Sequence, residues 1–522
     1  MYYGMLYNAI HVSTLKRRSE LKIEKRIIME NYDVIVVGAS NAGGFAAAAA
    51  AERGKKVLVI EKTSTVEHLY RHWLGGVNTK AQERAGIHID KNNLAQYLTA
   101  FAQDNVDQRL IWTWINHSGE AMDWLEEKIL KPKGDHLYSE RDAHYETLIN
   151  KAFPTEHHVT ADDKSDDKDY GNYVIEYAEK HGAKFRYRTK LEHLIINQEN
   201  RVIGVEVKNT KTNEVYDIMA NDAVILCTGG YGANPALVQK WNPTILKKCC
   251  YTQSPRDDGS GIVAAMEVGA AKDDEAASII FDRGAVPVGT NTKDTYVIDW
   301  KNPQYNLGSF MFLKVNLHGE RFFNESAPYQ FDMNSLMHQP GNMEVLIWNE
   351  YNMDHLKDYH TLGCSRVGWP GNKEVPDRKA QNEQKVKDGL VQKADSIEEL
   401  AEKLHLPKEN LVKTVKRYNE LVKKGNDDDF GKEKSRLLSI EGAPYYGAWF
   451  SGVLLSTLDG LHINDHMQVL NENGEAISGL YAAGNCSGDF FWGSYPDRVP
   501  GLTVSHAQTF GMLAGRYAVE MK

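Results

Sequence analysis

The segment YDVIVVGASNAGGFAAAAAAERGKKVLVIEK, residues 32–62, constrains the fold of this chain more than any other feature. DVIVV is a continuous apolar run that ends at Gly38, which is typical of a parallel strand buried on both faces. An alanine-rich helix is predicted over residues 43–53, and KVLVIE is predicted as a second buried strand ending at Glu61. Strand, tight turn, helix and strand in this order indicate a parallel sheet covered by helices.

The turn after the first strand has the spacing of a nucleotide-binding fingerprint. Gly38 permits the tight turn and Gly43 lets the helix lie close to the strand, while Ser40 stands where a middle glycine is usual. The free N–H groups at the start of the helix can hold a pyrophosphate, and Glu61 is placed to accept hydrogen bonds from a ribose. We therefore predict a dinucleotide site, with contacts from Gly38, Ser40, Asn41, Ala42, Gly43, Glu61 and Lys62.

Two later segments favour FAD over NAD as the dinucleotide. DAVILCTGGYGAN (residues 222–234) is predicted as a buried strand running into a Thr-Gly-Gly turn, and GLYAAGNCSG (residues 479–488) as another strand ending at Gly484. This order resembles that of two-dinucleotide-binding flavoproteins, whereas a nicotinamide dehydrogenase needs neither later strand. The chain has no second fingerprint for NADH, so we expect a different, unidentified electron donor or acceptor.

Size and charge limit the classes of protein to which the chain can belong. With 522 residues it is too long for one ordinary core, so two or more domains are expected. A formal net charge of -10 argues against a nucleic-acid partner. No stretch reaches the roughly 18 apolar residues of a membrane span, and residues 1–28 lack the apolar region of a signal peptide. We expect a cytoplasmic protein in which 1–28 is an extension before Met29.

The five cysteines are scattered through the chain and form no CxxC pair, haem-attachment motif or ferredoxin-type run. Such a set is typical of reduced thiols in a large intracellular chain rather than of a disulfide framework. We therefore predict no metal site, and we expect any electron transfer to use a bound organic cofactor or a partner protein.

Five motifs together resemble the family of fumarate reductase flavoproteins and 3-ketosteroid Δ1-dehydrogenases: WLGGVN (73–78), DDGSG (257–261), GERFFNESAPY (319–329), YNELVKKGNDDDFGK (418–432) and the closing AAGN…TFGMLAG. The resemblance implies an α/β fold, in which a Rossmann-like FAD-binding domain of the two-dinucleotide-binding type is interrupted by an α+β cap. Carried over to this chain, the first segment of the FAD-binding domain spans 29–285, the cap (substrate) domain spans 286–445, and the second segment of the FAD-binding domain spans 446–522.

The same resemblance implies how the flavin is held. Covalent attachment in some relatives uses a histidine upstream of a Gly-Gly pair, but His72 lies too close to Gly75 to match that motif. We expect non-covalent FAD. Besides the fingerprint, the residues implied as cofactor contacts are Gly75, Gly76, Val77, Asn78, Thr228, Gly229, Gly230, Asp258, Gly484, Asn485, Leu502 and Thr503.

The fumarate branch of the family handles a dicarboxylate, and most of its charged groups have no counterpart here. Tyr329 stands at the position of the proton-donating arginine, while Ser456 and Thr252 stand near the positions of two substrate histidines. Arg498 alone is retained, in the loop GSYPDRVPGLT. An arginine suits a carboxylate substrate, and it can equally form a salt bridge that braces the loop.

The ketosteroid branch matches more closely. NESAPY resembles the motif whose last tyrosine takes part in proton transfer beside the ketone, here Tyr329. The closing loop resembles the segment in which a tyrosine and a glycine N–H hold the ketone oxygen, and those roles fall on Tyr495 and Gly501. This loop is two residues longer here, and the branch's third tyrosine has no clear match among Tyr138, Tyr145 and their neighbours.

Three hypotheses for the function follow. The first is an FAD-dependent oxidoreductase acting on CH–CH bonds beside a ketone of an apolar, steroid-like substrate, by dehydrogenation or by enone reduction. The second is a fumarate- or urocanate-type enoate reductase that uses Arg498. The third is a flavin-binding subunit without turnover. The first hypothesis is favoured, because two hydrogen-bond donors can stabilise the negative charge on an enolate-like oxygen and a tyrosine can transfer the proton.

Overall fold

The computed structural model describes residues 30–65, 73–139, 153–162, 169–292, 296–298, 305–359 and 374–520. The predicted extension 1–28, together with His72 and Tyr145, lies outside these ranges. Within the described residues, no helix is long and apolar enough to cross a membrane. The chain is of the mixed α/β class, as predicted, and has two large sheets.

The first sheet is centred on the predicted fingerprint strand, β1 (Glu30–Val37). It is flanked on one side by β2 (Val57–Ile60) and on the other by β9 (Val215–Leu226), and all three are parallel. Beyond them lie β18 (Ala476–Ala482) next to β9 and β6 (Lys184–Arg186) next to β2, also parallel. The predicted buried strands are confirmed, because elements cover both faces of this sheet at its centre.

The alanine-rich helix α2 runs from Asn41 to Glu52, so it begins earlier than residue 43. It packs on the last helix, α15 (Leu502–Glu520), as well as on the sheet. A Cβ on Gly511 would lie 2.2 Å from the Ala42 carbonyl oxygen, and one on Gly515 would lie 2.3 Å from that of Ala46. Small residues on both helices therefore allow backbone-to-backbone contact, which carries the end of the chain to the fingerprint.

Further elements extend and cover this region of the molecule. Antiparallel strands at its rim are β7 (Thr189–Ile196), β8 (Val202–Asn209) and β17 (Gln468–Leu470). A small sheet joins β3 (Leu74–Gly75), β4 (His136–Tyr138) and β5 (Glu156–Thr160). The helices are α3 (Lys80–Arg84), α4 (Lys91–Phe101), α5 (Gln108–Leu125), α6 (Gly171–Lys180), α7 (Pro235–Trp241), α8 (Ile245–Lys248) and α9 (Ser260–Glu267).

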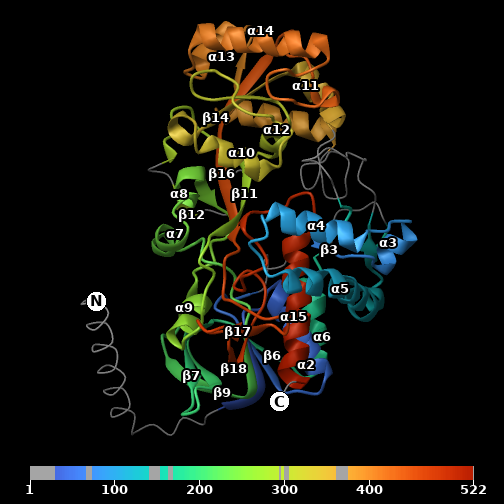
Figure 1. Cartoon of the computed structure of the whole chain (residues 1–522), viewed down its shortest axis with the longest axis vertical. Coiled ribbons are helices and arrows are strands. Elements are labelled where there is room, and N and C mark those ends of the chain that lie inside the picture. Colours follow the sequence, from blue (N-terminus) through green and yellow to red (C-terminus); the bar gives the residue numbers. More distant parts are fainter. Residues whose placement is uncertain are drawn as a thin grey trace, which may run out of the picture.

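The second sheet is built around two long strands, β11 (Ala277–Val286) and β16 (Tyr445–Thr457), which pair antiparallel. Its other strands are β10 (Cys249–Thr252), β12 (Val297–Ile298), β13 (Leu313–Val315), β14 (Glu344–Asn349), β15 (Gln392–Ala394) and β19 (Gly493–Ser494). Helices gather at the far end of this sheet (Figure 1): α10 (Tyr329–Leu336), α11 (Glu350–Asp354), α12 (Val375–Lys387), α13 (Ile397–Lys403) and α14 (Lys408–Lys424).

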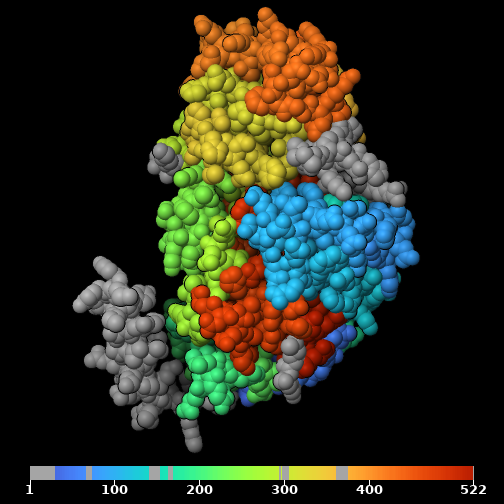
Figure 2. Space-filling view, in the orientation of Figure 1, coloured from blue at the N-terminus to red at the C-terminus, as the bar shows by residue number. Residues whose placement is uncertain are grey.

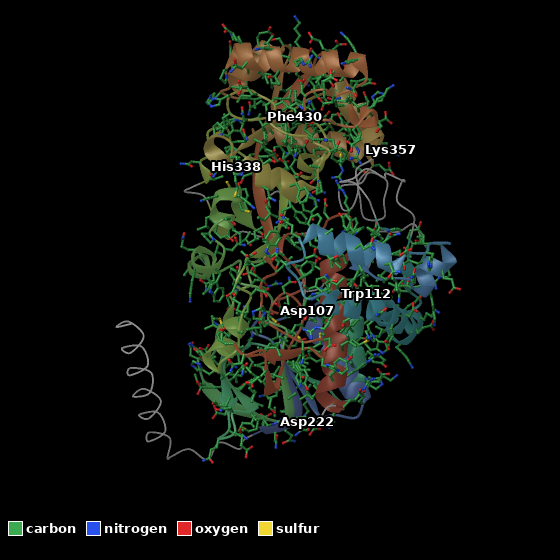
Figure 3. All side chains as sticks on the ribbon, viewed as in Figure 1. Asp107, Trp112, Asp222, His338, Lys357 and Phe430 are labelled. Carbon is green, nitrogen blue, oxygen red and sulfur yellow. The ribbon has the colours of Figure 1, made fainter. Side chains whose placement is uncertain are left out.

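The two ends of the molecule are distinct. In the space-filling view the yellow and orange segments cover one end, and the red C-terminal segment lies between the green and blue segments (Figure 2). Phe430, after α14, and Asp222, in β9, mark the opposite ends (Figure 3). The predicted domain boundaries at 286 and 445 coincide with the end of β11 and the start of β16. Because these two long strands run from one region into the other, the division into an FAD-binding domain and a cap stays a prediction.

Candidate active site

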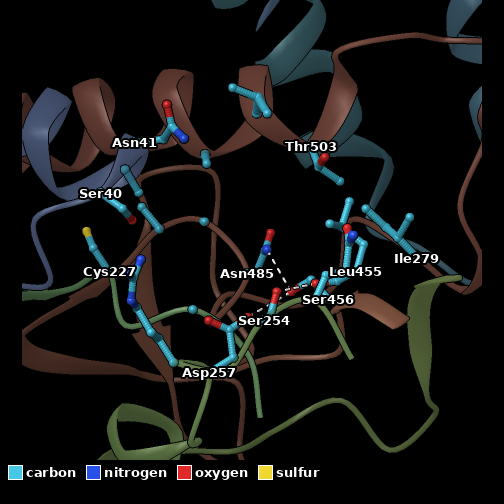
Figure 4. A pocket seen from close by; sticks show the side chains of 18 of the residues that line it. Ser40, Asn41, Cys227, Ser254, Asp257, Ile279, Leu455, Ser456, Asn485 and Thr503 are labelled. Atoms are coloured by element: carbon cyan, nitrogen blue, oxygen red, sulfur yellow. Dashed lines mark hydrogen bonds between the residues drawn. The ribbon is translucent and has the colours of Figure 1, made fainter. Parts of the chain in front are cut away.

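A groove follows the turn between β1 and α2 and continues toward the start of α15. It consists of two adjoining cavities that share Ser40, Cys227, Gly229, Arg256 and Asp257 as lining residues. Figure 4 shows the first of these cavities, between α2, the end of β16 and the start of α15. The predicted cofactor residues that line the groove are Gly38, Ser40, Asn41, Ala42, Glu61, Lys62, Thr228, Gly229, Gly484, Asn485 and Thr503.

Two glycines make the fingerprint turn possible. Gly38 has a φ of 101°, and a Cβ there would lie 2.3 Å from the Cys227 carbonyl oxygen. A Cβ on Gly43 would lie 1.8 Å from the carbonyl oxygen of Gly38. Ser40 precedes α2, and its side chain makes no capping hydrogen bond to the helix. The first N–H groups of α2 therefore face the groove without a side-chain cap, which suits a pyrophosphate.

Glu61 is fixed just after β2, at the opposite side of the turn. One of its carboxylate oxygens accepts a hydrogen bond from Ala39 N at 3.0 Å and the other from Thr63 N at 2.9 Å. It is buried yet lines the second cavity. A carboxylate oxygen can accept more than one hydrogen bond, so Glu61 remains able to receive a ribose hydroxyl.

Lys62, which follows Glu61, pairs with Asp258 through Nζ and Oδ2 at 3.0 Å. Burial acts to raise the pKa of Asp258, but the ammonium of Lys62 and the hydrogen bonds from Ser260 outweigh it and lower this pKa to about 2. Asp258 is therefore an anion that holds Lys62 at the groove. It does not line either cavity.

The two later glycine-ended strands supply the opposite wall. Gly229, just after β9, has a φ of 72°, and a Cβ there would lie 2.6 Å from Asp257 Oδ1. Asn485 donates to Ser456 Oγ at 2.9 Å, and Ser456 donates to Asp257 Oδ2 at 3.2 Å (Figure 4). The ends of the three predicted strands thus meet along one groove. The glycine turn at Gly38, the uncapped start of α2 and the carboxylate of Glu61 together fit FAD.

The remaining predicted cofactor residues do not line the two cavities: Gly43, Gly75, Gly76, Val77, Asn78, Gly230, Asp258 and Leu502. Gly75 instead packs on the turn at Gly501, since a Cβ on Gly501 would lie 2.1 Å from the Leu74 carbonyl oxygen. Asn78 holds its own loop by exchanging two hydrogen bonds with the backbone of Ile89, at 2.8 and 3.0 Å. The WLGGVN segment thus packs against the closing loop at Gly501 and lines neither cavity.

The closing loop, residues 493–501, contacts α10 directly. Tyr495 N donates to Gln330 Oε1 at 3.0 Å, and Asn334 donates to Ser494 Oγ at 3.0 Å. Because Gln330 follows Tyr329 in α10, these contacts bring the segments of both predicted catalytic tyrosines together. The sequence alone predicts each tyrosine in its own motif, 166 residues apart, and the fold places the motifs side by side.

The rings of the two tyrosines are held differently. Tyr329 is half-buried at the first position of α10, with its ring edge-on to Phe281 at 5.2 Å between centroids. The guanidinium of Arg283 lies 6.0 Å from the centre of the Tyr329 ring. Tyr495 is buried, and its hydroxyl accepts a hydrogen bond from Thr503 N at 3.4 Å. Thr503 lines the groove, so the Tyr495 hydroxyl lies next to a wall of the predicted flavin site.

Arg498 takes part in the contact between the closing loop and the segment just before α10. It is 4% exposed, and its Nη1 lies 3.1 Å from Asp497 Oδ2. Its Nη2 donates to the Ser326 carbonyl oxygen at 3.3 Å. Burial raises the pKa of Asp497, and the charge of Arg498 opposes that rise. The arginine is thus engaged in a salt bridge of the loop, one of the two roles expected for it.

Tyr97 belongs to no motif, and the sequence does not predict it as a site residue. It lies in α4, and its buried hydroxyl has no hydrogen-bond partner among the described residues. Its ring packs on Phe153 at 5.2 Å, and Phe153 N donates to the carbonyl oxygen of Arg498 at 2.9 Å. Burial and the negative charge of Asp497 raise the pKa of Tyr97. Only the fold places this tyrosine beside the closing loop.

The aromatic residues before the closing loop enclose a histidine. Phe490 and Phe491 are buried, and their ring centres lie 4.6 and 5.4 Å from that of His506. Neither ring nitrogen of His506 has a hydrogen-bond partner among the described residues. Burial lowers the pKa of His506 to about 3, so it stays neutral. Trp492 instead turns outward, where its ring nitrogen bonds Glu275.

One other cluster has the residue types of a metal site. Asp273, His462 and Asp489 each offer a ligand atom, and these atoms lie within 4.8 Å of one another. His462 Nδ1 is already 2.6 Å from Asp489 Oδ1, and Asp489 N donates to both oxygens of Asp273. The region lies beside Asp107 at the start of α5 (Figure 3), because Asp107 N donates to the carbonyl of Asp489. The cluster thus satisfies its own hydrogen bonds.

Comparisons with known proteins agree with this geometry. The family described as FAD binding domain matches residues 33–498. Vinyl phenol reductase of Lactiplantibacillus plantarum is 26% identical over 505 residues, covering 94% of this chain and 97% of that protein. Urocanate reductase of Eggerthella lenta is 26% identical over 539 residues, covering 98% of this chain and 80% of that protein.

A solved structure has a similar fold. The 3-ketosteroid Δ1-dehydrogenase of Sterolibacterium denitrificans matches with a TM-score of 0.74 and 20% identity, covering 95% of this chain and 100% of that one. The predicted resemblance, the fold class and the flavin cofactor are confirmed by these matches together with the family match.

Proposed function

Since this chain belongs to the FAD binding domain family and is an FAD-dependent oxidoreductase acting on CH–CH bonds, we propose that it forms or reduces a C=C bond beside a ketone of a steroid-like substrate. The cap predicted at 286–445 would then supply one wall of the substrate site and the closing loop the other. The electron donor or acceptor is a separate molecule.

One observation carries the choice of a ketone over a dicarboxylate. Arg498, the retained arginine of the fumarate branch, already has a carboxylate 3.1 Å away in Asp497, and both are buried. A carboxylate substrate needs uncompensated cations, because burying its charge without them is unfavourable. A ketone needs only neutral donors, and the hydroxyls of Tyr329, Tyr495 and Tyr97 can supply these.

Each residue then has a distinct task. Tyr495 and the N–H of Gly501 would donate to the ketone oxygen and stabilise the negative charge that develops there. Tyr329 would move the proton at the carbon beside the ketone. Tyr97, with its unpaired hydroxyl, takes the place of the third tyrosine that the resemblance implies. FAD, when bound, supplies the hydride acceptor or donor at this site.

The flavin would be held without a covalent bond. Ser40, Asn41 and the first turn of α2 would bind the pyrophosphate, and Glu61 the ribose. Thr503 and Asn485 would lie along the remainder of the cofactor in the groove. Mass spectrometry of the denatured protein tests this, since flavin released at the mass of free FAD is expected, and flavin still attached to the chain would refute it.

A second function is supported by the relatives. Vinyl phenol reductase and urocanate reductase are named as reductases, and each aligns with nearly the whole chain. Reduction of the C=C bond of a conjugated acid, or of the vinyl group of a phenol, is therefore the alternative. A conjugated acid would require Arg498 to contact the substrate as well as Asp497.

Substrate screening with the flavin-loaded protein separates the two functions. Anaerobic assays with reduced viologen as donor, and with an artificial acceptor for the reverse direction, should show turnover of 3-oxosteroids in at least one direction. Turnover of fumarate or urocanate, with none of any ketone, would overturn the proposal. If photoreduced flavin were reoxidised by no ketone, conjugated acid or vinyl phenol, the protein would be a flavin-binding subunit.

A further inference from the structure

The strongest feature not absorbed by the proposed function is the dipeptide Asp497–Arg498. It lies in the loop between Tyr495 and Gly501. Both residues are buried, with exposed fractions of 6% and 4%. A buried ion pair is weak evidence for stability, so its presence at the proposed substrate site calls for another explanation.

The geometry shows what Asp497 does to Arg498. Asp497 Oδ2 lies 3.1 Å from Arg498 Nη1 and also accepts a hydrogen bond from Tyr329 N at 3.4 Å. Arg498 Nη2 is held by the Ser326 carbonyl oxygen at 3.3 Å. The guanidinium is thus fixed toward α10 and the loop, and its charge is balanced by the carboxylate next to it.

The other oxygen of Asp497 is unused. Oδ1 is buried and has no hydrogen-bond partner among the described residues. The charge of Asp497 also acts on Tyr97, whose own hydroxyl is unpaired. A negative oxygen and a tyrosine hydroxyl therefore lie near one another where the closing loop meets α4. An anionic substrate group placed here would meet a like charge in a poorly screened environment, which is unfavourable and disfavours its binding.

We propose that Asp497 determines substrate specificity by neutralising Arg498 and so excluding substrates that carry a carboxylate at this position. The inference rests on the proposed function, because it assigns the neutral substrate class of that same site. Specificity of this kind arises from an unfavourable interaction with the wrong ligand rather than from a new favourable one with the right ligand. Without the charge of Asp497, the guanidinium would be available to bind a carboxylate.

The test compares four forms of the flavin-loaded protein: wild type, Asp497→Asn, Arg498→Gln and the double variant. Asn keeps the volume of Asp and an oxygen that can accept from Tyr329 N, but it carries no charge. The probe is fumarate, titrated while the visible absorbance of the bound oxidised flavin is followed. We expect Asp497→Asn to bind fumarate at least about tenfold more tightly than wild type.

The double variant is the matched control, because it removes the arginine that Asp497→Asn makes available. It should bind fumarate no better than wild type. The inference is overturned if Asp497→Asn holds FAD and unfolds cooperatively but binds fumarate as weakly as wild type. It is also overturned if the gain persists in the double variant. If Asp497→Asn does not fold, Asp497→Ser provides the same comparison with a smaller neutral side chain.

The two proposals fail in different ways. If wild type turns over no ketone in the substrate screen, the proposed function is wrong whatever the variants do. If wild type turns over a ketone and Asp497→Asn gains no affinity for fumarate, only the role of Asp497 is wrong.

Discussion

Replacing Tyr329 by phenylalanine removes one oxygen atom from the site and almost nothing from the packing. The ring of Tyr329 contacts Phe281 edge-on at 5.2 Å, and this contact does not involve the hydroxyl. The hydrogen bond from Tyr329 N to Asp497 belongs to the backbone and is also retained. We therefore expect the melting temperature and FAD content of Tyr329→Phe to stay close to those of wild type.

The rate should change much more than the stability. Loss of a general acid–base group lowers rates by about 10²–10⁴-fold, which is about 2.7–5.4 kcal/mol in the activation barrier. Anaerobic stopped-flow mixing of reduced protein with a ketone substrate measures this step directly, because flavin reoxidation in a single turnover is independent of the electron donor. The deficit should be in this step and in kcat, with a smaller change in substrate affinity.

Tyr305→Phe is the matched control for this experiment. Tyr305 is a fully buried tyrosine outside the closing loop and its contacts, and its hydroxyl bonds Asn382 at 2.6 Å. Its loss should lower the unfolding free energy by about 1 kcal/mol and leave turnover unchanged. If Tyr329→Phe kept more than half of wild-type turnover with every ketone tested, proton transfer would not depend on this hydroxyl.

Three further outcomes follow from the geometry. Gly43→Ala should abolish FAD binding, because its Cβ would lie 1.8 Å from the carbonyl oxygen of Gly38 and displace α2; flavin absorbance after purification measures this. Tyr97→Phe should reduce turnover while stability stays equal or rises, because an unpaired buried hydroxyl is removed; activity and thermal unfolding measure both. His506 and His157 are buried, and burial lowers the pKa of each to about 3. The stability that they contribute is therefore complete above pH 6.5 and is lost as the pH falls toward 3, by about 1.4 kcal/mol per pH unit for each histidine. Urea unfolding between pH 7 and pH 5 measures this slope.

These outcomes have their own controls. Gly54→Asn, at a position with no atom within 4 Å of the added Cβ, should keep FAD, and FAD retained in Gly43→Ala would show that the turn is not needed. Unchanged activity in Tyr97→Phe would remove that tyrosine from the site. His506→Leu should lower the number of protons taken up on unfolding, which is given by the pH slope of the unfolding free energy, by one. An unchanged slope would mean that His506 is not neutral when folded.

The fingerprint makes much of the first sheet predictable. Continuous apolar runs that end at glycine, such as the one before Gly38, indicate buried parallel strands from local sequence alone. The same holds for the strands before Gly229 and Gly484, so three edges of the groove can be predicted from sequence. The packing of α15 on α2 cannot, because it depends on glycines in one helix facing alanines in another far away in the chain.

The candidate site is predictable only where motifs exist. Tyr329 and Tyr495 each lie in a motif, and the structure brings their segments together. Tyr97 lies in a helix with no motif and can be found only from its position beside the closing loop. For Arg498 the sequence allows both a substrate contact and a salt bridge, because it does not show which way two adjacent charged side chains turn.

Reoxidation of the bound flavin tests the proposed ketone chemistry most directly. Purified protein, loaded with FAD and photoreduced without oxygen, is mixed in separate experiments with a 3-oxosteroid enone and with fumarate, and the visible absorbance of oxidised flavin is recorded. We predict that the absorbance returns with the enone and not with fumarate, and that Tyr329→Phe slows this return by at least about 10²-fold. Return of the absorbance with fumarate alone, at a rate unaffected by Tyr329→Phe, would contradict both the substrate class and the role of this tyrosine.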